Sequence, residues 1–85
     1  MEEKLIGKVS HFFDKISVAA IKVEGGIKVG DELHFIGHGA DFTQSVDSMQ
    51  VEGESVESAK SGDEVGMKVS EKTKPGVEVY LVSGE

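Results

Sequence analysis

Residues 18–37 read VAAIKVEGGIKVGDELHFIG, and this stretch decides the fold. Its first six residues are mostly apolar, as in a β-strand that is buried on both faces. The sequence EGG at 24–26 predicts a turn, because glycine adopts backbone angles that other residues avoid. Residues 32–37 place Leu33 and Phe35 on one face and polar side chains on the other, the period-two pattern of a half-buried strand. The stretch therefore predicts two strands joined through glycine-rich turns.

Similar patterns recur along the rest of the chain. Strands are predicted over residues 4–13, 16–23, 32–37, 41–51, 64–69 and 77–82. The polar residues 52–58 predict a loop, and only 55–61 would tolerate a helix, of one turn at most. Six short strands at this spacing predict an all-β fold, a small closed six-stranded, mainly antiparallel β-barrel that forms a single domain over 1–85. Closure would leave no strand edge exposed.

Alternation along these strands also predicts which side chains fill the barrel. The predicted inward set is Val9, Val18, Ala20, Leu33, Phe35, Val65, Met67, Val69, Val79 and Leu81. In the first strand, Leu5, Gly7 and Val9 are expected to share one face.

Two glycines stand directly before an aspartate and a strand, as Gly30-Asp31 and Gly62-Asp63. A glycine in this place can adopt a positive φ and turn the chain sharply into the strand. The aspartate can accept hydrogen bonds from the amides of the turn. We expect these four residues, together with Gly26, to form turns rather than a site of chemistry.

The same motifs resemble a known family. Residues 26–33, GIKVGDEL, and 59–66, AKSGDEVG, are similar to two strand-entry motifs of domain 2 of elongation factor Tu and related translational GTPases. A similar barrel forms the C-terminal domain of the U32 peptidase family. The resemblance implies a barrel and, for the translation factors, contact with tRNA. Residues 12–15, FFDK, stand where that family has a glycine-rich hairpin. Because the tRNA-contacting positions of the family cannot be matched one by one, we assign no tRNA-contacting residue in this sequence.

Charge argues against nucleic acid as the partner. The 85 residues carry a net charge of −7, with nine lysines and no arginine. Nucleic-acid binding depends on neutralising phosphates, and arginine supplies the bidentate contact to them. We therefore expect a protein partner. Because the longest apolar runs span only a few residues, we also expect no membrane contact and a cytoplasmic location. The absence of cysteine excludes disulfides and cysteine-based zinc sites.

The sequence offers little catalytic chemistry. The nearest stretch to a phosphate-binding loop, residues 53–61, has the wrong spacing and lacks the second glycine, so no nucleotide binding is expected. His34 and His38 are four residues apart along a strand, too far to share one ion. A metal site would require His11 to approach one of them, above all His34, with Asp41 nearby, and isolated surface histidines are the stronger interpretation. We expect no enzymatic activity, no cofactor and no metal.

Large apolar side chains are the candidate binding residues. A barrel this small cannot bury every large side chain, so Phe12, Ile36, Phe42 and Tyr80 are predicted either to form a partner surface or to be covered by a loop such as residues 52–58. Phe12 and its neighbour Phe13 point to opposite faces of a regular strand, so one should lie inside and the other outside. The sequence thus favours a non-catalytic module that docks a protein partner in a translation-related process. The alternative is an accessory domain that contacts RNA or tRNA in translation or tRNA modification.

Overall fold

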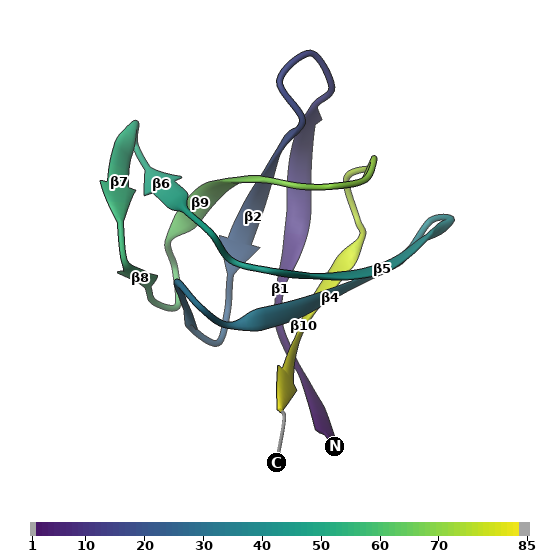
Figure 1. Cartoon of the computed structure of the whole chain (residues 1–85), viewed down its shortest axis with the longest axis horizontal. Helices are drawn as coiled ribbons and strands as arrows, with labels where there is room; N and C mark the ends of the chain where they lie inside the picture. Colours follow the sequence, from purple (N-terminus) through teal and green to yellow (C-terminus); the bar gives the residue numbers. More distant parts are fainter. Residues whose placement is uncertain (1, 84–85) are drawn as a thin grey trace.

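The computed structural model describes residues 2–83 as an all-β fold in which every strand pairing is antiparallel. The strands are β1 (Glu2–Phe13), β2 (Val18–Val23), β3 (Ile27–Lys28), β4 (Glu32–Gly37), β5 (Ala40–Ser45), β6 (Met49–Val51), β7 (Glu54–Val56), β8 (Ser58–Ala59), β9 (Glu64–Lys68) and β10 (Glu78–Ser83). An eight-stranded sheet has the order β5-β4-β10-β1-β2-β9-β6-β7, and β3 pairs with β8 in a second, two-stranded sheet (Figure 1).

The predicted closed six-stranded barrel is wrong in its strand number and in its closure. The outermost strands of the large sheet, β5 and β7, do not pair with each other. Instead the chain runs from the end of β5 through residues 46–48 directly into β6, across to the other side of the molecule (Figure 1). A side chain makes a further link: Gln44 on β5 bonds to the backbone of Lys68 and Ser70. The two sides of the sheet are therefore joined by a crossing segment and an amide side chain.

Some predicted elements divide or change type. The single strand expected over 41–51 is two strands, since the chain leaves β5 at Ser45 and crosses before β6. The polar stretch 52–58, expected to be a loop, contains β7 and the start of β8. Glu52 and Gly53 have φ angles of 52° and 82° and make the tight turn between β6 and β7. Positive φ at both central residues is the signature of a two-residue hairpin turn.

The core contains most of the predicted inward set. Val9, Leu33, Phe35, Val65, Met67, Val69 and Val79 are buried, and Leu81 is half-buried against them. Val18 and Ala20 are only half-buried, because Ala19, Ile21 and Val23 face the core in β2. That strand is apolar on both faces, and only Lys22, which is exposed, marks its outer side.

The pairing of β1 with its neighbours is irregular at two points. Its register shifts between Leu5 and Gly7 against β10, and again between Val9 and His11 against β2. These irregularities place Ile6, Gly7 and Val9 in the core, whereas strict alternation predicted Leu5 beside Gly7 and Val9. A β-bulge inserts one residue on one strand and so reverses the faces of the residues that follow.

Candidate functional site

The two glycine-aspartate motifs form equivalent turns. Gly30 and Gly62 have φ angles of 98° and 97°, and Gly26 has 93°. The Asp31 carboxylate accepts the amide of Lys28 at 3.0 Å, and the Asp63 carboxylate accepts the amide of Lys60 at 3.1 Å. In both turns the aspartate amide returns a bond to the same residue's carbonyl. These contacts lead the chain into β4 and β9.

The backbone at Gly30 supplies a direct test of this turn. We expect Gly30→Val to lower the free energy of unfolding by about 1–3 kcal/mol, the cost of holding a β-branched residue in a sparsely populated backbone region. A β-carbon there would meet nothing within 4 Å, so the loss comes from the backbone angle alone. Urea titration measures it. Gly30→Asn is the control and should lose less, because asparagine tolerates positive φ better; equal losses would exclude the backbone explanation.

The predicted partner residues do not form one exposed surface. Phe42 is buried, which corrects its assignment, because it alternates inward along β5 and stacks on Phe35 with ring centroids 4.8 Å apart and planes 2° apart. Phe12 is half-buried and packs against the core, so Phe13 is the outer member of that pair. Ile36 and Tyr80 are half-buried on the outer side of the sheet.

The most exposed large apolar side chains lie elsewhere. Phe13, the last residue of β1, is 46% exposed, and Ile16, in the turn that leads to β2, is 60% exposed. Phe12, Asp14 and Lys15 complete the lining of a hollow of about 310 Å³ at this turn. We call residues 12–16 the hairpin tip. It projects at the end of the molecule opposite to the two termini (Figure 1).

The hairpin tip has a defined conformation. The Ile16 amide donates to the Phe13 carbonyl at 3.3 Å, and Ser17 takes a φ of 56° to bring the chain into β2. The His11 ring packs on Phe13 with centroids 4.7 Å apart. The exposed apolar side chains are therefore presented on a structured turn, which lowers the entropy lost when a partner binds.

The three histidines do not converge. His11 lies beside the hairpin tip, and His38 lies beside Gly76. His34 on β4 instead bridges two carboxylates: Nδ1 lies 2.8 Å from Glu3, and Nε2 lies 2.6 Å from Asp41. Within residues 2–83 no three histidine or acidic side chains gather as metal ligands. Since each ring nitrogen faces a different carboxylate, only the doubly protonated imidazolium donates to both.

This bridge predicts a dependence on pH. The hydrogen bonds to Asp41 and then Glu3 raise the pKa of His34 above its usual value near 6.5. A raised folded-state pKa means that protonated His34 stabilises the fold below about pH 6.5, and that this contribution is lost as pH rises through the folded-state pKa. We expect Asp41→Asn to lower that pKa in an NMR titration of the ring. Asp47→Asn removes the same charge from a residue that does not bond to His34, so it should leave the pKa of His34 unchanged. A pKa that is unchanged in Asp41→Asn but lowered in Asp47→Asn would exclude the bridge.

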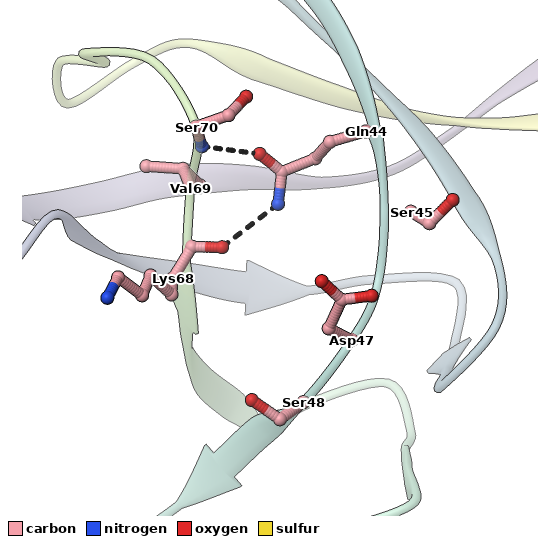
Figure 2. Close-up of a pocket in the computed structure, with 7 residues that line it drawn as sticks. All are labelled: Gln44, Ser45, Asp47, Ser48, Lys68, Val69 and Ser70. Carbon is pink, nitrogen blue, oxygen red and sulfur yellow. Dashed lines mark hydrogen bonds between the residues drawn. The ribbon is translucent and has the colours of Figure 1, made fainter.

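A hollow of about 520 Å³ lies where the two sides of the sheet meet. Figure 2 shows Gln44 reaching across it, with Nε2 2.9 Å from the Lys68 carbonyl and Oε1 2.7 Å from the Ser70 amide. Ser45, Asp47 and Ser48 line the same hollow. A serine nucleophile needs a base such as histidine beside it, and all three histidines of the chain have the other positions given above. The Gln44 contacts join β5 to the end of β9 and the residues that follow it.

Comparison with known proteins places this fold in a family. Residues 2–78 match the family described as the peptidase family U32 C-terminal domain. The chain belongs to that family. The U32 C-terminal domain resembles the C-terminal domain of a Geobacillus thermoleovorans protein described as a U32 peptidase, with a TM-score of 0.89 over 94% of this chain and 93% of the other at 22% identity. At that identity the match shows the fold alone. The U32 part of the expected resemblance is confirmed, and the comparisons do not show the resemblance to elongation factor Tu.

Curated relatives are much longer than this domain. An uncharacterized protease of Methanocaldococcus jannaschii is 38% identical over 78 residues, which are 91% of this chain and 19% of that protein. A collagenase of Porphyromonas gingivalis is 28% identical over 81 residues, 93% of this chain and 22% of its own length. The U32 C-terminal domain thus spans about a fifth of the length of these relatives.

No helix within residues 2–83 is long and apolar enough to cross a membrane.

Proposed function

We propose that this domain is a non-catalytic module that docks unfolded polypeptide for a peptidase of the U32 type. The observation that carries the proposal is the hairpin tip, which exposes Phe13 and Ile16 on a structured turn. Exposed aromatic and aliphatic side chains gathered at one place are typical of protein-binding sites. Full burial of such a side chain contributes roughly 1.5–3 kcal/mol, so the two together give a weak, reversible contact.

The chemistry of the tip fits a polypeptide better than a charged ligand. Asp14 and Lys15 balance each other's charge at the tip, so it repels neither acidic nor basic segments. Relatives described as a protease and a collagenase act on polypeptides, and the present domain matches only a fifth of each. A module of this size contributes binding, while the remaining length of such a protein supplies cleavage.

Binding to unfolded polypeptide tests the proposal. Gelatin and β-casein serve as probes, and the affinity is measured by biolayer interferometry. We expect Phe13→Ser together with Ile16→Ser to weaken binding at least about tenfold. Val29→Ser is the matched control, because Val29 is also exposed, at 40%, but lies outside the tip, and it should bind as the unchanged domain does. Absence of binding by the unchanged domain, or equal loss in the control, would refute the proposal.

The RNA alternative has weak support in the arrangement of charges. Lys8 and Lys22 are cross-strand neighbours, but Lys8 also pairs with Glu78 and Lys22 with Glu64, so carboxylates flank both. Lys28 lies in the separate β3–β8 pair.

We expect no tRNA binding tighter than about 100 μM at physiological salt, the weak end of non-specific affinity. Fluorescence anisotropy with labelled tRNA measures it. Saturable low-micromolar binding that is lost when Lys4, Lys8, Lys22 and Lys28 are replaced would favour the RNA function over polypeptide docking.

A further inference from the structure

A second apolar area lies on the outer face of β4, β10 and β1. Leu5, Ile36 and Tyr80 are half-buried there. Tyr80 lies between Val79 and Leu81, which pack in or against the core, so its side chain points outward. Its cross-strand partners are Leu5 on β1 and His34 on β4, which share that outer face. We call Leu5, Ile36 and Tyr80, with the side chains around them, the outer face.

Four carboxylates lie around the apolar centre of the outer face, and Lys8, the cross-strand partner of Glu78, is the cation among them. Glu78 pairs with Ile36 and accepts the Tyr80 hydroxyl at 2.9 Å, and Glu3 and Asp41 hold His34. Glu32, at the start of β4, is exposed and pairs with Val82 of β10. An apolar, tyrosine-containing centre with a charged rim is the composition of a protein interface, and the acidic rim favours a partner that presents lysine or arginine.

The cluster at His34 also makes the outer face rigid. Glu3 belongs to β1, His34 to β4 and Asp41 to β5, and β10 lies between the first two strands. The two hydrogen bonds therefore tie β1 to the far side of the sheet on its outer surface. A surface held in one arrangement loses less entropy when it is covered.

The position of the chain ends indicates what covers this face. Glu2 pairs with Ser83, so β1 begins and β10 ends at the same end of the molecule, beside Glu3 and Val82 (Figure 1). In relatives this domain accounts for about a fifth of the protein, and its family is described as C-terminal, so the larger part joins at the start of β1. A part that joins there is tethered at the end of the molecule that carries Glu3 and Val82, beside the outer face, and away from the hairpin tip.

We infer that the outer face packs against the catalytic part of a U32-type peptidase, through basic residues of that part, whether it lies in the same chain or in another. This inference rests on the proposed function. It assigns the two apolar areas different partners: the catalytic part binds the outer face, and unfolded polypeptide binds the hairpin tip. Interfaces between the domains of one chain are typically more polar than obligate interfaces between subunits, which agrees with the charged rim of the outer face.

Footprinting of a full-length protein tests the inference. The Methanocaldococcus jannaschii protease is produced with this chain in place of its own matching segment, and hydroxyl radicals label exposed side chains for mass spectrometry. We expect labelling of Tyr80 and Leu5 to fall at least about threefold relative to the isolated domain. Phe13 and Ile16 should be labelled equally in both. Equal labelling of Tyr80 in the two proteins, or protection of the tip instead, would overturn the inference.

A charge-reversal variant tests whether the charge of the rim, rather than any change of surface charge, affects the contact with the partner. Glu32→Lys in the full-length protein should restore Tyr80 labelling to at least half its level in the isolated domain, because it places a cation against a basic partner. Glu54→Lys is the matched control, an exposed strand glutamate on β7, and should leave Tyr80 protected. Restoration by both variants, or by neither, would overturn the inference. Loss of gelatin binding in the tip variant is measured separately, so the proposed function can stand while this inference fails.

Discussion

Replacing Phe35 with alanine should lower the free energy of unfolding by about 3–5 kcal/mol. Phe35 is fully buried at the middle of β4, where it pairs with Val79 on one side and Phe42 on the other. Its ring stacks in parallel on Phe42, so its removal opens a cavity against a second large side chain. A domain of this size has roughly 5–10 kcal/mol of total stability, which makes the loss a large fraction of it.

Urea titration followed by circular dichroism measures this loss. Val29→Ala is the control, because Val29 is exposed, and a surface change of this kind stays within about 0.5 kcal/mol. Phe42→Ala completes a double-mutant cycle. The stacked rings predict that the double variant loses less than the sum of the single losses, since the second truncation enlarges a cavity that already exists. A loss below about 1 kcal/mol in Phe35→Ala would show that Phe35 is not part of the core.

β4 shows what the sequence can predict. Its bounds, 32–37, are those predicted, because the apolar Leu33 and Phe35 alternate with polar residues and glycine turns flank the strand. The same alternation correctly placed Val65 and Met67 of β9 and Val79 of β10 in the core. A strand with one polar face has one register that buries its apolar side chains, so its orientation follows from local residue order.

The errors have a common physical cause, which is that they depend on contacts between distant residues. Bulges in β1 are set by its neighbours β10 and β2, and they move Ile6 inward without any local signal. Phe42 was assigned to the partner surface because a small barrel was not expected to bury every large side chain, but the pairing of β5 with β4 stacks it on Phe35. The link between the two sides of the sheet depends on Gln44, which bonds to the backbone of a residue 24 positions away in the sequence.

The candidate site was predictable only in part. One member of the pair Phe12 and Phe13 had to lie outside, and the structure selects Phe13. Ile36 was correctly placed on the outer side of β4, because it follows Glu32 and His34 at period two. The contact of Glu3 with His34 spans 31 residues of sequence and depends on β10 lying between their strands. No pattern within either strand indicates it.

The close approach of β2 to β1 explains why residue 7 is glycine. A β-carbon at Gly7 would lie 2.6 Å from the Lys22 carbonyl oxygen and 3.0 Å from the Ile21 side chain. The first of these contacts is with the backbone of β2, which cannot move without disturbing its pairing with β1 and β9. Real side chains essentially never approach so closely, so β1 and β2 would have to separate locally.

We therefore expect Gly7→Ala to lower the free energy of unfolding by about 1–3 kcal/mol, the usual cost of adding a methyl group to a packed interior. Gly66→Ala is the matched control on β9, the other neighbour of β2. A β-carbon at Gly66 has its nearest contact at 3.5 Å, an ordinary distance. There the loss of backbone freedom in the unfolded chain makes alanine neutral or stabilising by up to about 1 kcal/mol. Urea titration of the two variants decides between close approach and a general intolerance of alanine. Equal stability changes at both positions would show that the contact with Lys22 is not what requires glycine.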